Sequence, residues 1–370
     1  MNINTKIFKI IRSKDSTFKE YYLSFLEIYP QYIYKYNLSA FDYYESISKS
    51  SENHSFLFVS DDHVFAYCPL VVEKINNRYH GSLANGTATL SSPIFSEELS
   101  KRQKRRAEKE VYEEFKRICL KLDIDHVIYQ SESISISFNN LEDNLFARNG
   151  ALDISGCHNI VDLNETEERI WEYQIRHSYK SIINRGYKHY TFKVYDQTNY
   201  IDEIGERHRL LHHKCSGKIT RPLISYEKMY SWINNNNGLM FEQIYKDKTV
   251  QMIMVGVGKY SAIGASAAED PDISVPCPMT HSMNHYIYLE CKKRGIRYYD
   301  VGETTNRGNI FYMPNKKNLN INYFKSGFGK KYPFKRWIWF PTLDKEIEYT
   351  EKQFMKYKDY LKNLIAGSQS

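Results

Sequence analysis

The sequence predicts an α/β (α+β) fold made of two tandem copies of one unit, each a mixed, mainly antiparallel sheet flanked by helices. Short β-branched and aromatic runs separated by turn residues predict a strand meander in each half. Each meander is followed by apolar residues at helical spacing and then by one more short strand. The two series repeat at a spacing of about 185 residues, although few side chains are identical.

In the first copy we expect a strand at 56–60, a turn at Asp61–Asp62, a strand at 63–73, a helix at about 100–122 and a strand at 124–130. The helix is predicted by apolar residues three and four positions apart, namely Ala107, Val111, Phe115, Ile118 and Leu122. Residues 1–55 are expected to mix helix and loop.

The second copy is predicted to hold strands at 239–245, 249–258 and 260–268, a helix at 280–294 and a strand at 297–301. Its turn at 246–248 corresponds to Asp61–Asp62, and Pro278 corresponds to Pro93. A helix beginning after Asn164, with acids near its amino end, should connect the copies. Further helices are expected at 200–214, at 226–234 and, as a charged tail, at 345–364. Because no long Ser/Gly linker intervenes, we predict two packed domains, 1–163 and 164–370.

Composition excludes several classes of protein. The 370 residues are 42% hydrophobic and 15% aromatic, which supports packed cores and argues against general disorder. No apolar run approaches the ~20 residues of a spanning helix, and the amino terminus lacks a signal peptide's apolar core, so we expect a cytoplasmic protein. The six cysteines show no Cys-x-x-Cys pair and no zinc-site spacing, which favours buried thiols and no metal. The net charge of +7 suits a polyanionic ligand such as a nucleotide or coenzyme A.

Two motifs stand out in the second half of the chain. Residues 293–304 combine a basic helix end, a C-cap glycine at Gly295 and a short strand with Asp300 at its far end. Ligands of open α/β sheets gather at the carboxyl ends of strands, which favours a site at Asp300, Gly302, Glu303 and Asn306. The second motif is Phe324-Lys-Ser-Gly-Phe-Gly329, a lysine among aromatics followed by two glycines.

This pair of motifs resembles the carboxyl-terminal half of the Fem-type acyltransferases, tandem members of the GNAT superfamily that include FemA, FemB and FemX. The matching residues are Gly295, Tyr299–Gly302 and Phe324–Gly329, together with a helix at 171–186 that resembles the family's inter-domain helix. The resemblance implies acyl transfer from an activated carbonyl to an amine. It also implies a place for Lys325 near the acyl donor or the charge of the transition state. Several Fem enzymes carry a coiled-coil arm within the second unit, and the sequence shows no such heptad insertion there.

We therefore predict three sets of site residues. The catalytic set is Asp300, Glu303 and Lys325, the two acids acting as bases or as structural acceptors. The acceptor-binding set is His212, His213, Lys218, Arg221, Asn306 and Tyr299, in which the cations of a turn-rich stretch would hold an anion. The donor-binding set, at the start of the 280–294 helix and in the second motif, is Cys277, Met279, Thr280 and Phe324. Histidines four residues apart on the 200–214 helix lack the His-Glu-x-x-His order and any completing ligands, so we expect no metal.

The function we expect is N-acylation of a nucleotide-linked (dTDP or UDP) amino sugar by an acyl-CoA, with an acetyl or hydroxyacyl group, in surface-polysaccharide (O-antigen or capsule) biosynthesis. FdhC-type sugar N-acyltransferases are similar in size and layout. One alternative is aminoacyl transfer from aminoacyl-tRNA in peptidoglycan bridge synthesis. Another is a non-catalytic RNA-binding protein, although no RNA-recognition motif is present and the basic residues are scattered. A homodimer is expected from the frequency of such assemblies alone.

Overall fold

The computed structural model describes residues 8–28, 34–48, 50–131, 134, 145–304 and 308–367. Its strands are β1 Lys9–Arg12, β2 Ser51–Asn53, β3 Phe56–Ser60, β4 His63–Cys68, β5 Val71–Ile75, β6 Arg78–Gly81, β7 Leu90–Ser91, β8 Ile94–Phe95, β9 Ile124–Ser131, β10 Leu152–Asp153, β11 Gly156–Asp162, β12 Thr191–Tyr195, β13 Gly238–Tyr245, β14 Lys248–Val257, β15 Ser261–Glu269, β16 Tyr298–Glu303 and β17 Lys330–Trp339. Its helices are α1 Phe18–Ile28, α2 Leu38–Ile47, α3 Lys101–Lys121, α4 Glu167–Tyr173, α5 His177–His189, α6 Asp202–Ser216, α7 Leu223–Asn234, α8 Met279–Lys293, α9 Lys316–Lys325 and α10 Leu343–Gly367.

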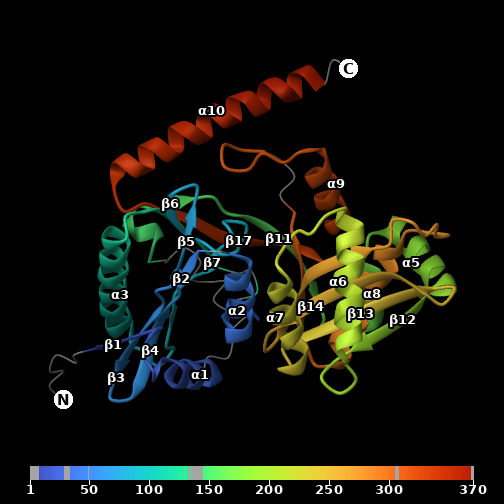
Figure 1. Cartoon of the computed structure of the whole chain (residues 1–370), viewed down its shortest axis with the longest axis horizontal. Helices are drawn as coiled ribbons and strands as arrows, with labels where there is room; N and C mark the ends of the chain where they lie inside the picture. Colours follow the sequence, from blue (N-terminus) through green and yellow to red (C-terminus); the bar gives the residue numbers. More distant parts are fainter. Residues whose placement is uncertain are drawn as a thin grey trace.

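The mixed α/β class is confirmed. Among the described residues, one sheet of 13 strands runs from β12 through β13, β14, β15, β16, β11, β17, β9, β6 and β5 to β2, with β10 and β7 paired beside this path. A second sheet holds β1, β3, β4 and β8. The amino-terminal and carboxyl-terminal halves lie side by side, and α10 runs along the top of the view (Figure 1).

In the sheet of the second half, alternate side chains of a strand pack into two different hydrophobic cores. Leu239 and Phe241 of β13 face a core formed with α5 and α8, whereas Met240 between them faces a core formed with α6 and α7. Successive side chains of a strand point to opposite faces, so each strand contributes to both cores. The sheet is therefore covered by α5 and α8 on one face and by α6 and α7 on the other.

Both predicted hairpins are present, with the same turn chemistry. Asp61 and Asp62 join β3 to β4 with positive φ angles, and Lys246 and Asp247 join β13 to β14 in the same way. Two-residue turns of this kind match the twist of the strands that they join. The correspondence between the two turns supports the predicted repeat of one unit.

Three predicted elements differ from the structure. The strand at 63–73 is split into β4 and β5 at Pro69, which has no N–H and whose carbonyl accepts a bond from the Tyr129 hydroxyl. The helix after Asn164 is split into α4 and α5, because Ile175 forms a β-bridge with Phe328 instead of continuing the helix. Asp300 lies inside β16, which extends to Glu303, and not at its end.

β1 and β2 lie within residues 1–55, which were expected to hold only helix and loop, and β10 and β12 were also not predicted. Two further strands that the sequence did not predict, β11 and β17, join the halves of the chain. β11 precedes residue 163 but pairs with β16 and β17 of the second half. β17 continues from β11 to β9 of the first half, where Trp337 and Trp339 enter the core of that half. The domain division at residues 163 and 164 stays a prediction.

Candidate functional site

The centre of the second-half sheet contains two strands that diverge. β15 and β16 are parallel and pair from Ser261 with Tyr298 to Ile263 with Asp300, where their register ends. β15 then continues to Glu269 along β14. Its residues 264–268 are Gly-Ala-Ser-Ala-Ala, of which Gly264 and Ala267 are exposed. An unpaired strand edge offers backbone N–H and C=O groups to a ligand that carries amides.

Helix α8 follows β15 and begins beside the end of that strand. Its N-cap is Pro278, which provides no side-chain cap. The Thr280 hydroxyl lies 2.5 Å from the Glu269 carboxylate and 3.1 Å from the side-chain nitrogen of Gln251, so the first turn of α8 is tied to β15 and β14. The free N–H groups of a first helical turn favour an anion.

Asp300 sits at the point where the strands diverge and is held from two sides. Nδ1 of His158 on β11 lies 2.7 Å from one carboxylate oxygen, and the backbone N–H of Gly302 donates to the other oxygen at 2.7 Å. His158 and Asp300 are 5% and 4% exposed. The buried pair fixes β11 against β16 and holds the backbone at Gly302, whose φ of +99° suits glycine.

Lys325 ends α9 and packs onto that glycine. A Cβ at position 302 would lie 2.6 Å from Nζ of Lys325, so the ammonium occupies the space that only glycine leaves open. Burial lowers the pKa of Lys325, while the carboxylates of Asp300 and Glu303 oppose the shift. The three residues of the predicted catalytic set therefore do lie together.

Glu303 is engaged by an arginine that the sequence did not single out. Nη2 of Arg336 on β17 lies 3.0 Å from a Glu303 oxygen, and Nε of the same residue donates to Gln130 on β9 at 2.9 Å. The cluster thus connects to a strand of the first half of the chain.

The turn after Lys325 is fixed by tight packing. Gly329 has a φ of +67°, and a Cβ there would collide with the carbonyl of Ile160 on β11. The backbone N–H of Arg176 donates to Gly327 O at 2.8 Å, and its guanidinium donates to Ser326 Oγ at 2.8 Å. A Cβ at Gly327 would collide with the ring of Tyr179, so packing explains both glycines of the second motif, and the hydrogen bonds of Arg176 accompany the break between α4 and α5.

Only some residues of the predicted acceptor-binding set lie together in the structure. Arg221 donates to the hydroxyls of Tyr43 on α2 and Ser266 on β15 at 2.6 and 2.9 Å, and it stacks 4.2 Å over the ring of Tyr226. His212 lies 3.0 Å from the Tyr226 hydroxyl, and burial, with Arg221 next, lowers its pKa to about 4.

Burial also lowers the pKa of the neighbouring His208 to about 3. His213 contacts the same Tyr226 ring at 5.5 Å. Arg221, His212 and His213 thus form one cluster beside β15. The cluster touches β15 at Ser266, three residues after Ile263, the last residue of β15 that pairs with β16.

The other predicted residues lie elsewhere. Lys218 is exposed in the loop between α6 and α7, and Asn306 lies outside the described residues. Tyr299 is 3% exposed and packs against Tyr288 in the core with α8. In the donor-binding set, the side chains of Cys277 and Met279 belong to a small buried cluster with Tyr190 and Val250.

Phe324 instead lies in an aromatic group next to Lys325. It stacks with Tyr179 of α5 at 5.9 Å and meets His281 of α8 edge-on at 4.9 Å. Burial lowers the pKa of His281, and its buried Nδ1 has no hydrogen-bond partner among the described residues. His281 and His158 were missed because a single histidine in a helix or strand carries no distinguishing sequence pattern.

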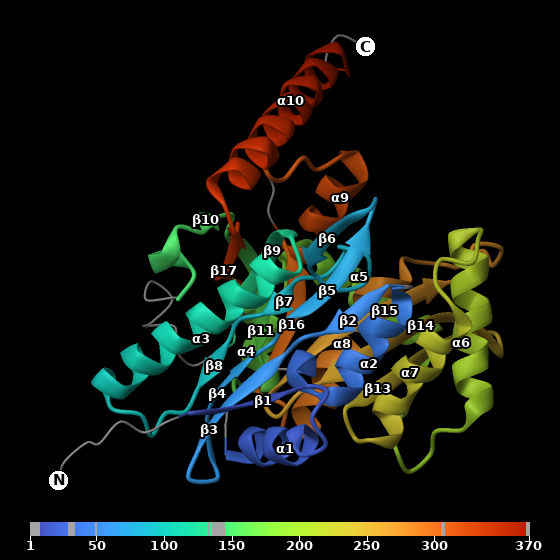
Figure 2. The same cartoon turned by 60° about the vertical axis from the view of Figure 1, so that its left-hand side comes forward.

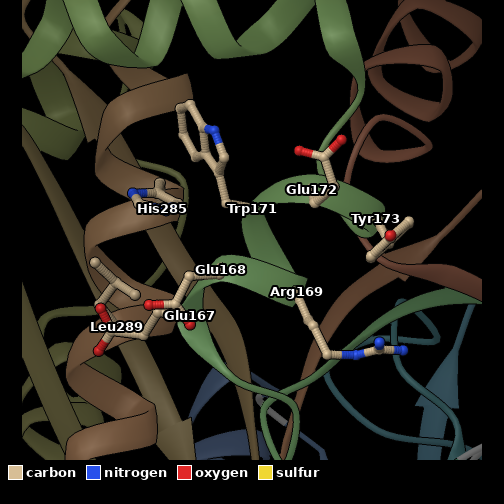
Figure 3. A pocket seen from close by; sticks show the side chains of 8 residues that line it. All are labelled: Glu167, Glu168, Arg169, Trp171, Glu172, Tyr173, His285 and Leu289. Carbon is tan, nitrogen blue, oxygen red and sulfur yellow. The ribbon is translucent and has the colours of Figure 1, made fainter.

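A shallow pocket of about 590 Å³ lies one helical turn further along α8. Figure 3 shows side chains of α4 and α8 on its two sides, with Trp171 beside His285. The lining residues are Glu167, Glu168, Arg169, Trp171, Glu172, Tyr173, His285 and Leu289. None belongs to the predicted site.

The described residues contain neither a candidate membrane span nor a candidate metal site. None of the helices in these ranges is long and apolar enough to cross a membrane. Within the same ranges, no three His, Cys, Asp or Glu side chains come together as metal ligands.

No protein-family model and no curated protein sequence matches the chain, so the comparison rests on solved structures. A crystal structure of FemX matches with a TM-score of 0.62 and 10% identity over 90% of this chain and 97% of that chain. The carboxyl-terminal domain of a putative lysylphosphatidylglycerol synthetase from Agrobacterium fabrum matches with a TM-score of 0.58 and 12% identity over 86% and 92%. A tandem GNAT protein from the clavulanic acid biosynthesis pathway matches with a TM-score of 0.52 and 8% identity over 91% and 99%. The chain therefore has the Fem-like tandem-GNAT fold.

Proposed function

We propose that this protein is an acyltransferase that moves an acyl group from an activated donor to an amine, with its reaction centre at Lys325. The observation that carries the proposal is the position of this partly desolvated ammonium. It lies against Gly302, on the part of β16 that has separated from β15. The fold of the structural neighbours supports the same reaction class, since one of them is a tandem GNAT protein described with reference to acetyl-CoA.

The chemistry requires few groups. The neutral amine attacks the acyl carbonyl, a C–N bond forms, and the bond from the carbonyl carbon to the leaving sulfur or oxygen breaks. The proton that the amine loses ends on the departing thiol or alcohol, directly or by replacing a proton that Lys325 gives to it. The ammonium of Lys325 would donate a hydrogen bond to the oxyanion or a proton to the leaving group, and its lowered pKa makes it a better proton donor. Asp300 is buried and would act by holding Gly302, and through it Lys325, in place.

The donor would approach the open edge of β15. Residues 264–268 have small side chains, so the amide groups of an extended arm could pair with this edge. The first turn of α8 would face the donor's phosphates, and Phe324 and His281 would line the path towards Lys325. For an anionic acceptor, the cluster of Arg221, His212 and His213 supplies a guanidinium next to the same strand.

For the substrates we propose an acyl-CoA and a nucleotide-linked amino sugar. The second candidate function is aminoacyl transfer, and the structural neighbours favour it. FemX and two lysylphosphatidylglycerol synthetases share the fold. One of these synthetases, from Bacillus licheniformis, matches with a TM-score of 0.50 and 15% identity. Both candidates use an amine and an activated ester or thioester, so Lys325 has the same task in either reaction.

The deciding experiment is a thermal-shift panel with coenzyme A, acetyl-CoA, dTDP, UDP and uncharged tRNA, followed by transfer assays with radiolabelled acyl donors. A ligand at a hundred times its Kd stabilises the folded state by about 2.7 kcal/mol. Shifts with coenzyme A and one nucleoside diphosphate would support the sugar acyltransferase. A shift with tRNA alone would select aminoacyl transfer. The absence of acyl transfer from either kind of donor to any amine tested would overturn the proposal.

A further inference from the structure

The carboxyl-terminal helix α10 carries apolar side chains in a heptad pattern. If Ile347, Phe354 and Leu361 occupy the a positions of a heptad repeat, then Thr350, Tyr357 and Leu364 occupy the d positions. Leu343 is the d residue of the preceding heptad. Spacing that alternates between three and four residues keeps these side chains in one stripe along a helix, which is the pattern of a helix that pairs with another helix. The 25 residues of α10 give it a length of about 37 Å.

Five of the seven side chains in this stripe are exposed to solvent, and Thr350 and Tyr357 are half-buried. Leu343, Ile347, Phe354, Leu361 and Leu364 are between 40% and 69% exposed. Figures 1 and 2 show α10 projecting beyond the two sheets. Five large apolar side chains exposed along one side of a helix are uncommon on a monomer and mark an interaction surface.

The helix is anchored to the body through residues outside the stripe. Tyr349 packs against His126 at 4.9 Å, the Tyr360 hydroxyl donates to Pro314 O at 3.2 Å, and Lys345 pairs with Asp123 at 2.6 Å. The stripe is thus held in a fixed position while its own face stays open.

The charges along α10 are divided between its two ends. The first part holds four acids against one lysine, namely Asp344, Glu346, Glu348 and Glu351. The second part holds four lysines against one aspartate, namely Lys352, Lys356, Lys358 and Lys362. Two such helices repel one another when parallel and in register, and they attract one another when antiparallel. The acidic half also disfavours docking on an anionic membrane.

We propose that α10 pairs with α10 of a second copy of this chain, antiparallel and across a two-fold axis. A two-fold axis perpendicular to the helices makes the surface self-complementary, as a closed dimer requires. In antiparallel pairs an a position faces a d position of the partner, so the stripe can form three kinds of layer, each twice. Phe354 faces Tyr357 at the centre, Thr350 faces Leu361 beside it, and Ile347 faces Leu364 at the ends.

In this register, oppositely charged side chains of the two copies lie next to one another beside the stripe. Glu351 and Lys358 occupy equivalent e positions on the same flank of the stripe, and the two-fold axis brings Glu351 of one copy next to Lys358 of the other, twice. Both side chains are exposed, and among the described residues neither forms an ion pair within its own chain. The two flanking pairs set the direction of pairing, while the apolar layers supply most of the attraction.

The test is the mass of the full chain in solution, measured by sedimentation between about 1 and 100 μM in low salt. We expect a dimer whose dissociation constant rises at least roughly tenfold in the variant Phe354→Glu/Leu361→Glu, because two charges enter an apolar seam. The matched control is Ile219→Glu/Leu223→Glu, which places two acids on exposed apolar positions outside α10 and should leave the dimer intact.

Charge reversal then tests the orientation. Glu351→Lys alone and Lys358→Glu alone should each weaken the dimer about fivefold, because each creates two like-charge contacts. The double variant should restore it, and Lys352→Glu, on the outer side of the helix, should have no effect. A monomer at every concentration, a dimer indifferent to the seam variant, or a failure of the double reversal to rescue would overturn the proposal. A monomer that binds phosphatidylglycerol vesicles through Phe354 and Leu361 would overturn it as well.

Discussion

Nδ1 of His158 lies 2.7 Å from Oδ2 of Asp300, and the two residues are 142 positions apart in the chain. The contact joins β11 to β16 inside the sheet, where both side chains are buried. A buried carboxylate needs partners for its oxygens, and here His158 and the Gly302 N–H provide them. The same carboxylate therefore supports both the sheet and the backbone on which Lys325 rests.

Replacing Asp300 should affect stability as well as activity. In Asp300→Ala the buried His158 and the Gly302 N–H lose their shared acceptor, which should lower the free energy of unfolding by roughly 1–3 kcal/mol. Asp300→Asn keeps an acceptor and should retain more of this stability. Urea unfolding of the two variants beside the wild type measures the difference. Equal stability of all three proteins would show that the pair does not hold the strands together.

Lys325 should matter for turnover and not for folding. Removing a charged donor that acts on developing negative charge typically slows turnover by about 10²–10³-fold, which is our expectation for Lys325→Ala. Lys316→Ala, at the exposed other end of α9, is the control and should be fully active. Because burial lowers the pKa of Lys325, wild-type activity that needs the ammonium should decline at a lower alkaline pH than that of an ordinary lysine. Unchanged turnover in Lys325→Ala would remove this residue from the reaction.

Gly329 and Gly295 form a matched pair for testing the second motif. Both have positive φ angles, but a Cβ at 329 would collide with the Ile160 carbonyl, whereas one at 295 would meet nothing within 4 Å. Gly295→Ala should cost about 1 kcal/mol through backbone strain alone. Gly329→Ala should cost about 2 kcal/mol or more, because β11 or the turn must also move. Thermal unfolding of both variants is the measurement, and equal losses would contradict the assigned packing.

The buried histidine of α6 should make the protein less stable in acid. Burial lowers the pKa of His208 to about 3, below the ordinary histidine value of 6.5. Between these values the unfolded chain binds the proton and the folded chain does not, so the free energy of unfolding falls as the pH drops from 6.5. The slope for one such group is at most about 1.4 kcal/mol per pH unit.

His208→Gln removes this titration and should make the dependence of stability on pH between 4.5 and 6.5 less steep by one such group. His126, His212 and His285, whose pKa values burial lowers to about 4, keep the remainder. His63→Gln, at an exposed position, should leave the dependence unchanged. Urea unfolding across this pH range distinguishes the two, and an undiminished slope in His208→Gln would show that other groups cause the acid sensitivity.

The sequence by itself determined most local structure and the tandem arrangement. Helix α3 and the hairpins of both halves follow from periodicity and turn residues, and Asp300, Glu303 and Lys325 were found because they lie in motifs only some twenty residues apart. The heptad stripe of α10 is also present in the sequence.

Tertiary structure decided what those elements meet. It paired Asp300 with His158 and Glu303 with Arg336, split one predicted helix at Ile175, buried Tyr299 and left the apolar side of α10 uncovered. These outcomes depend on strand register and on which faces pack together. Contacts between residues far apart in the chain set both, and local periodicity describes only the residues within a few positions of one another.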